Sequence, residues 1–217
     1  MNVANKSLQL PETAQQRGKI APAYLAHIVF KTPNFKKMIE WWCTVLEAKP
    51  SMANESLAFL TFDEEHHRIA IINVPALLPL PKFVRGLDHV AFTYRNLSDL
   101  LATHQRLQAE GITPVWCTNH GPTTSIYYAD PDGNKAELQV ENFDTAEDML
   151  RWAEGPDFVD NPIGVDFDPS ELLVRLQAGE PEVSLKHRPS DGQRKLSSVP
   201  VKVLGRVHKL LAGLAGR

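Results

Sequence analysis

The sequence predicts an α+β fold in which two βαβββ modules pair into one domain, followed by a C-terminal helical extension. A strand pattern occurs twice, because Ala26–Phe30 resembles Asp88–Phe92. Each copy precedes an amphipathic helix pattern and further strand patterns, so the chain carries an internal repeat of about 60 residues. A dense turn signal closes the second copy. We place the modules at about residues 24–75 and 86–143, within a domain of residues 21–145.

The first module follows from periodicity. Leu25–Thr32 alternates between two faces, which predicts a strand. Phe35–Glu47 has apolar residues at helical spacing, and Asn34 stands where an N-cap is expected. Leu57–Phe62 and Arg68–Val74 are β-prone runs separated by a polar turn, so they are predicted as two further strands.

The second module begins after a proline-punctuated linker at Pro75–Pro81. Gly86–Tyr94 is predicted as a strand that matches the first strand of the chain. Ser98–Glu110 is an amphipathic helix pattern that its serine can cap and that Gly111 ends. Ile112–Cys117 is the next predicted strand.

A β-hairpin is predicted for residues 125–141. Ser125–Tyr128 is β-prone, and Asp130–Asn134 (DPDGN) is a turn sequence. Lys135–Glu141 then alternates, with apolar side chains on one face and Glu137 on the other. The turn places Glu137 rigidly three residues downstream. Taken alone, Glu137 would be interpreted as a solvated charge, and it is the position of the histidines upstream that reverses this interpretation.

The two ends of the chain carry weaker signals. Residues 1–20 are expected to be a flexible N-terminal arm, and residues 146–217 a C-terminal extension. The extension contains helix patterns at Glu147–Glu154 and from Asp168 to about Gly179, then a polar irregular stretch at residues 180–200. Val201–Leu214 has the pattern of a basic amphipathic helix, suited to a partner subunit or a membrane surface, or else of a solvated tail.

Composition narrows the class of protein. The chain of 217 residues has a net charge of −3 and is 43% hydrophobic and 23% charged, which is ordinary for a globular domain. No apolar run reaches the length of a membrane span, and the N-terminus lacks a secretory signal. Cys43 and Cys117 form no close-spaced motif, so a reducing cytoplasm is expected. Eight basic and two acidic residues follow from Glu182 onward, but we expect no nucleic-acid partner.

Two histidines occupy matching positions in the repeat. His27 and His89 each lie in the first strand of a module, and Glu137 lies in the last strand of the second. If the modules face one another across a cleft, two imidazoles and a carboxylate converge, which is the ligand set of a facial triad for Fe(II). The repeat places Ala70 where a fourth ligand could stand, so three ligands predict an open, catalytic metal site.

At this point the chain resembles the vicinal oxygen chelate superfamily, and within it the single-domain type I extradiol ring-cleaving dioxygenases. The resemblance covers about residues 24–143. Its motifs are Ala26–Val29 (AHIV), Phe59–Ala70 (FLTFDEEHHRIA), Leu87–Phe92 (LDHVAF) and Tyr127–Glu137 (YYADPDGNKAE). The aspartate-rich turn followed by glutamate is common throughout the superfamily. The paired histidines before Arg68 and the position of Tyr127 are more specific to the dioxygenases.

The resemblance implies a role for each site residue. The metal ligands would be His27, His89 and Glu137, holding Fe(II) or Mn(II). His67 would be the acid–base residue, since its ordinary pKa is near 6.5. Tyr127 would bind the deprotonated oxygen of a catechol, and His120 would lie over the substrate, although it precedes Tyr127 by fewer residues than the family pattern has. The partners would be a small aromatic diol and O₂, and a homodimer is expected.

Two other functions stay open at the level of sequence. The same scaffold and metal serve isomerases, epimerases and glutathione-linked lyases, which stabilise an enediolate on the metal and often use a fourth ligand. Ala70 argues against that class. The third hypothesis is a metal-free binding module that sequesters a small molecule.

Overall fold

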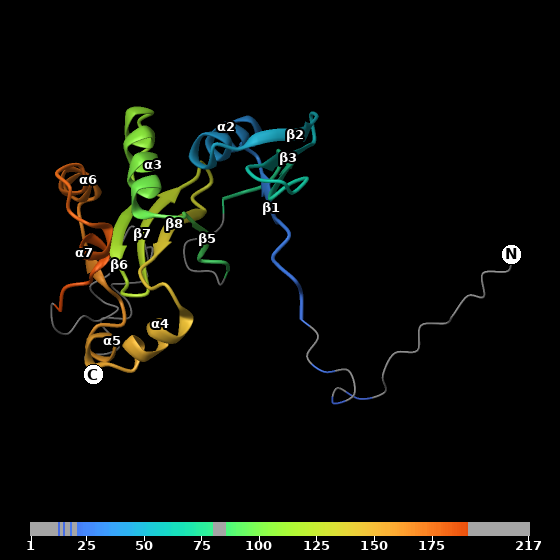
Figure 1. The fold of residues 1–217 in the computed structure, drawn as a ribbon. Coiled ribbons are helices and arrows are strands. Elements are labelled where there is room, and N and C mark those ends of the chain that lie inside the picture. Colours follow the sequence, from blue (N-terminus) through green and yellow to red (C-terminus); the bar gives the residue numbers. More distant parts are fainter. Residues whose placement is uncertain (1–12, 14, 16–17, 19–20, 80–85, 191–217) are drawn as a thin grey trace, which may run out of the picture.

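The computed structural model describes residues 13, 15, 18, 21–79 and 86–190 (Figure 1). Most of the predicted N-terminal arm lies outside the described residues, as do the later part of the linker and the predicted basic helix at residues 201–214.

The α+β prediction with two βαβββ modules is confirmed. The first module consists of β1 (Ile28–Thr32), α2 (Phe35–Leu46), β2 (Lys49–Ala53), β3 (Leu57–Thr61) and β4 (Ile69–Asn73). The second consists of β5 (His89–Thr93), α3 (Leu97–Ala109), β6 (Trp116–Asn119), β7 (Thr123–Ala129) and β8 (Lys135–Glu141). The sheets have the strand orders β1-β4-β3-β2 and β5-β8-β7-β6-β9, where β9 (Val165–Asp166) comes from the C-terminal extension, and Figure 1 shows the two modules beside each other.

The two modules share one register. β1 runs parallel to β4 with Val29 opposite Ala70, and β5 runs parallel to β8 with Ala91 opposite Glu137. Ala70 in the first sheet therefore occupies the place that Glu137 has in the second. The predicted alignment of the repeat is correct at this position, and the first sheet offers an apolar methyl group where the second offers a carboxylate.

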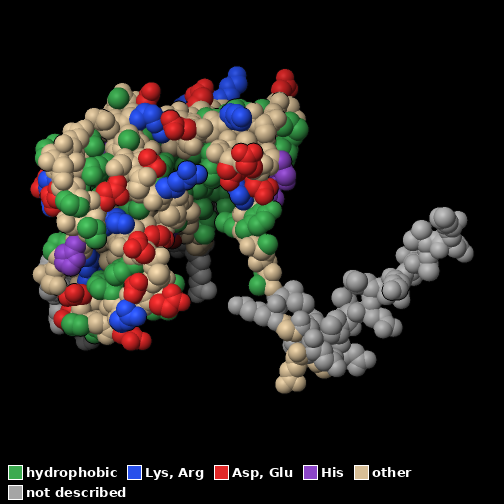
Figure 2. Space-filling model, viewed as in Figure 1, with side chains coloured by type: hydrophobic (Ala, Val, Ile, Leu, Met, Phe, Trp, Pro, Cys, Tyr) green, Lys and Arg blue, Asp and Glu red, His purple; other side chains and the backbone are tan. Residues whose placement is uncertain are grey.

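The helices join the modules through their apolar faces. α2 buries Met38, Trp42 and Val45, and each of these side chains is fully shielded from solvent. Trp42 packs on its own sheet but also meets Phe92 of β5, with ring centroids 6.0 Å apart. Val45 belongs to the core cluster of the second module. Burial of such side chains contributes about 1.5–3 kcal/mol each, so the contacts across the junction are an integral part of the core. Figure 2 shows hydrophobic side chains gathered where the modules meet.

Local boundaries differ from the sequence predictions in several places. β1 begins at Ile28, three residues later than predicted, which leaves His27 just before the strand. β2 was not predicted, because it contains Pro50 and all five of its residues are exposed. Asn34 is the N-cap residue of α2, as predicted, but its side chain makes no capping hydrogen bond; its amide donates instead to Asp132 Oδ1 at 2.7 Å.

The start of α3 also corrects a prediction. Asn96, not Ser98, caps this helix, and its Oδ1 accepts from the backbone N–H of Asp99 at 2.7 Å. The backbone N–H of Ser98 donates to Glu182 at 2.9 Å. A carboxylate at a helix N-terminus is favoured by the exposed N–H groups and by the helix dipole, so this contact ties the C-terminal extension to the second module.

The extension is more structured than its sequence predicts. It contains α4 (Ala146–Ala153), α5 (Pro156–Asp160), β9 (Val165–Asp166), α6 (Pro169–Gln177) and α7 (Glu182–Lys186). α7 corrects the expectation that the stretch after residue 180 is irregular. β9 pairs with β6 and extends the second sheet by one strand. No helix in the described part of the chain has the length and apolar character that a bilayer crossing requires.

Candidate active site

The β7–β8 hairpin presents Glu137 toward Tyr127. These residues are directly opposite in the antiparallel register, and the Tyr127 hydroxyl donates to Glu137 Oε1 at 2.8 Å. Glu137 is only 5% exposed, although it lies on the face that carries charged residues further along the strand. A buried carboxylate needs compensating partners, so this residue is not the solvated charge that the strand pattern alone would suggest.

His89 supplies the second partner of Glu137. It begins β5, the strand next to β8, and its Nε2 lies 2.9 Å from Glu137 Oε2. Its other ring nitrogen, Nδ1, lies 2.7 Å from Asp88 Oδ2, and Lys135 Nζ donates to the same carboxylate at 2.8 Å. A carboxylate on the far nitrogen orients an imidazole and fixes its tautomer, as is usual for metal-binding histidines.

The surroundings of Glu137 and His89 favour a negatively charged carboxylate beside a positively charged imidazole. Burial alone would raise the pKa of the Glu137 carboxyl. Hydrogen bonds from His89, Ser125 and Tyr127 outweigh that effect and hold the pKa below its usual value. The hydrogen bond to Glu137 in turn raises the pKa of His89, against the opposing effect of burial. A cation that binds between these side chains must therefore displace a proton from the imidazole.

His120 extends the network on the other side of Tyr127. It follows β6, and its Nε2 lies 2.9 Å from the Tyr127 hydroxyl oxygen. Its Nδ1 faces the backbone carbonyl of Ile163. The Trp116 ring stacks on Tyr127, with centroids 5.1 Å apart and an interplanar angle of 25°. Four of the six predicted site residues are thus in one continuous chain of contacts, which runs from His89 through Glu137 and Tyr127 to His120.

The other two predicted residues belong to the first module, just before its strands β1 and β4. His67 is 8% exposed and stacks on Phe59, with centroids 4.2 Å apart. The His27 ring is tilted against His67 at a centroid distance of 4.5 Å. Burial lowers the pKa of His67, and the neighbouring His66 and His27 lower it further. His67 is therefore not the plain surface histidine that its sequence neighbourhood also allowed.

The predicted metal triad is divided in this conformation. In residues 21–79 and 86–190, no three His, Cys, Asp or Glu side chains lie close enough together to hold a metal ion. His27 precedes β1, so sheet register does not fix its direction, and Arg68 Nη1 donates to the carbonyls of Leu25 and Ala26 beside it. His27 nevertheless lines a cavity of about 700 Å³ whose other wall is formed by residues 90–93 of β5.

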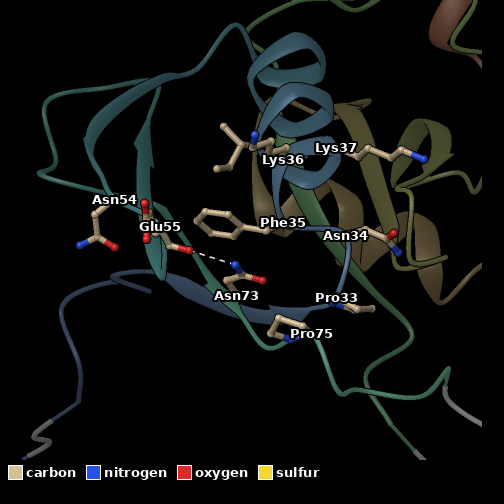
Figure 3. A pocket seen from close by; sticks show the side chains of 10 residues that line it. Pro33, Asn34, Phe35, Lys36, Lys37, Asn54, Glu55, Asn73 and Pro75 are labelled. Atoms are coloured by element: carbon tan, nitrogen blue, oxygen red, sulfur yellow. Dashed lines mark hydrogen bonds between the residues drawn. The ribbon is translucent and has the colours of Figure 1, made fainter.

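Another cavity in the described part of the chain lies away from this chemistry. It has a volume of about 890 Å³ and lies between the start of α2 and the β2–β3 turn. Figure 3 shows Phe35 projecting into it, with Asn73 bonded to the Glu55 carbonyl at one side and Lys37 directed outward. It is lined by Pro33, Asn34, Phe35, Lys36, Lys37, Ile39, Asn54, Glu55, Asn73 and Pro75. With no histidine and one carboxylate among these residues, the cavity offers no set of transition-metal ligands.

Sequence reasoning did not identify the residues that support the site. Asp88 orients His89, and the signal for it is its place before the histidine, where the first module has Ala26. Lys135 holds Asp88 from the first residue of β8. The contacts of His120 with the C-terminal extension have no local sequence signal, because they join residues more than forty positions apart.

Comparisons with known proteins agree with the fold. A family model described as the Glyoxalase/Bleomycin resistance protein/Dioxygenase superfamily matches residues 24–138. Biphenyl-2,3-diol 1,2-dioxygenase 2 of Rhodococcus globerulus is 45% identical over 72% of this chain and 83% of its own length. Biphenyl-2,3-diol 1,2-dioxygenase 3 of the same organism is 40% identical over 76% of this chain and 87% of its own. A glyoxalase/dioxygenase structure from Nostoc punctiforme is 16% identical, covers 57% of this chain and 97% of its own, and has a TM-score of 0.46.

Proposed function

Because this chain belongs to the glyoxalase/bleomycin resistance protein/dioxygenase superfamily, we propose that it is an Fe(II)-dependent extradiol dioxygenase that cleaves the ring of a catechol-type diol with O₂. Its place among the extradiol ring-cleaving enzymes rests on two relatives that are 45% and 40% identical over 72% and 76% of this chain. The single observation that supports the chemistry is the contact chain of His89, Glu137, Tyr127 and His120.

The separation of two of the three proposed ligands is compatible with their binding one ion. Nitrogen and oxygen ligands about 2.1 Å from one ion, at right angles, lie about 3 Å apart. His89 Nε2 and Glu137 Oε2 are 2.9 Å apart. The third ligand, His27, does not reach them in this conformation, so the triad of His27, His89 and Glu137 stays a proposal. It is supported by the cavity that His27 shares with β5, the strand that begins with His89. Bound Fe(II) would supply open coordination positions for the diol and O₂.

Tyr127 and His120 would position the substrate. The Tyr127 hydroxyl donates to Glu137 and also lies beside His120 Nε2, so it can exchange hydrogen-bond partners without moving. Burial first, and then the charge of Glu137, raise the pKa of Tyr127, which keeps its proton in place at neutral pH. A neutral hydroxyl is a suitable donor to a deprotonated catechol oxygen.

His67 would be the acid–base residue. Because burial and two neighbouring histidines lower its pKa, the ring is neutral near pH 7 and can accept a proton from the diol. Phe59, stacked on one face of His67, limits the directions in which the ring can turn.

Anaerobic reconstitution with Fe(II) tests this function. Biphenyl-2,3-diol is the first substrate to try, because both Rhodococcus relatives are named for it. Iron-loaded protein mixed with the diol and air should consume one O₂ per ring and form a yellow ring-opened product. The same protein treated with a chelator should do neither. Iron-loaded protein that takes up no O₂ with biphenyl-2,3-diol or with simpler catechols would contradict the proposal.

Two finer expectations are part of the proposal. We expect a homodimer, which light scattering of the purified protein would test. We also expect the protein to act in the cytoplasm, where Cys43 and Cys117, which form no disulfide in the described structure, would stay reduced.

A further inference from the structure

The His120 ring is held by the C-terminal extension. Its Nδ1 faces the carbonyl oxygen of Ile163, which can only accept a hydrogen bond, so Nδ1 carries a proton. This fixes which ring nitrogen faces Tyr127: Nε2 lies 2.9 Å from the tyrosine hydroxyl. The orientation of His120 in the site therefore depends on the position of one backbone carbonyl 43 residues further along the chain.

The turn that presents Ile163 is organised by Asn161, which is 1% exposed. Asn161 Oδ1 accepts from the backbone N–H groups of Ile163 at 3.1 Å and Gly164 at 2.8 Å. Gly164 has a φ of 119°, and a Cβ there would lie 2.4 Å from the carbonyl oxygen of Asn119. The turn thus lies against the end of β6, directly before His120.

Arg188 ties this turn to the His120 backbone. Its Nη1 donates to the carbonyl of Asn161 at 2.8 Å and to that of His120 at 3.2 Å. Its Nη2 donates to the carbonyl of Asp157. Arg188 is 6% exposed, and a guanidinium is a rigid planar fork of donors. One side chain therefore sets the spacing of three backbone segments. One of these segments contains His120, and another presents the Ile163 carbonyl that contacts the His120 ring.

Trp152 closes the other side of the same assembly. The Arg188 guanidinium lies over its ring, 4.9 Å from the centroid, which is favourable for a cation and an aromatic face. The Trp152 ring also covers Gly121, where a Cβ would lie 1.9 Å from the ring edge. The loop after His120 is thus packed against the extension with no room for a side chain.

We propose that Arg188 is a positioning residue for the ring-cleavage site, acting through His120. It holds the Asn161 turn and the His120 backbone together, so that His120 Nε2 stays against Tyr127. This inference rests on the proposed function. Trp152, the Asn161 turn and Arg188, which together hold His120 and are called the clamp below, lie outside the segment that the family model matches, because that segment ends at residue 138.

A double-mutant cycle tests the inference. Arg188→Ala should lower kcat/KM by about 10- to 100-fold with the iron content unchanged, because a small misplacement of a substrate-positioning group has effects of this size. Arg175→Ala is the matched control: Arg175 lies in the same extension, in a partly exposed ion pair with Glu180. In protein that already carries His120→Ala, the added Arg188→Ala should change kcat/KM by less than about 2-fold. Equal losses in both backgrounds would overturn the inference.

Two further measurements keep the result decisive. If Arg188→Ala does not fold, the same cycle is run with Arg188→Lys, which keeps the cation but loses the fork; the loss should again require His120. If the wild-type protein cleaves no diol, the proposed function fails, and NMR signals of the His120 imidazole test the clamp separately. Those signals should shift in Arg188→Lys and not in Arg175→Ala. Unchanged His120 signals in Arg188→Lys would overturn the inference.

Discussion

The carboxylate of Glu137 lies 2.9 Å from Nε2 of His89 on the neighbouring parallel strand, buried at the end of a hairpin. Glu137→Gln keeps the shape of this side chain and removes its charge. We expect Fe(II) affinity to fall by about 100-fold or more, since even outer-sphere changes weaken metal sites by 10- to 100-fold. Anaerobic metal titration measures this. Glu141→Gln is the control, because Glu141 lies on the same strand and face but is exposed; equal loss in both variants would contradict the assignment.

Tyr127 and Tyr128 are sequence neighbours, but Tyr127 faces the proposed active site and Tyr128 is buried in the core. Tyr127→Phe removes the hydroxyl that contacts Glu137 and His120, so kcat/KM should fall by about 10- to 100-fold with iron retained. Tyr128→Phe removes a buried hydrogen bond to His104 Nδ1 instead. That variant should lose about 1 kcal/mol of stability and keep its activity. Steady-state kinetics and urea denaturation of both variants check the pair, and a reversed pattern would refute the site geometry.

His67 and His66 form a similar pair. His67→Ala should retain iron and lose most of its turnover, because the buried ring is the proposed proton acceptor. His66→Ala removes the exposed neighbour that contacts His67 Nδ1 and lowers its pKa, so this variant should lose less activity than His67→Ala. Full activity in His67→Ala would remove the acid–base role.

His104 should make stability sensitive to acid. It is buried on the core side of α3, and burial lowers its pKa below the ordinary value of 6.5. Below that pH the unfolded chain binds a proton that the folded chain excludes, so stability should fall as the pH falls from about 6.5. His104→Gln cannot be charged and can still bond Tyr128. Urea midpoints at pH 7.5 and 5.5 should differ less in this variant than in the wild type, and an equal difference would show that His104 does not contribute.

Much of the fold was predictable because the sequence contains the same βαβββ pattern twice. The repeated strand, the helix periodicity and the DPDGN turn are local signals, and each corresponds to an observed element. β2 escaped prediction because an exposed edge strand with a proline has no apolar alternation. α7 escaped because a single turn of helix is stabilised by its contact with α3 and not by its own propensity.

The part of the site that lies within the second sheet was predictable from the sequence. The spacing of Tyr127 and Glu137 follows from the hairpin register, and His89 follows from the strand beside it. The place of His27 depends on how two modules meet, and no local pattern encodes that. Arg188 is 68 residues from His120, and only the folded extension brings them together.

The most direct test of the account is whether His27 binds the same ion as His89 and Glu137. Anaerobic calorimetric titration with Fe(II) should show one ion per chain in the wild type. His27→Ala and His89→Ala should each weaken binding by at least about 10-fold, while His66→Ala should match the wild type. A His27→Ala protein that binds Fe(II) as tightly as the wild type would contradict the three-ligand centre.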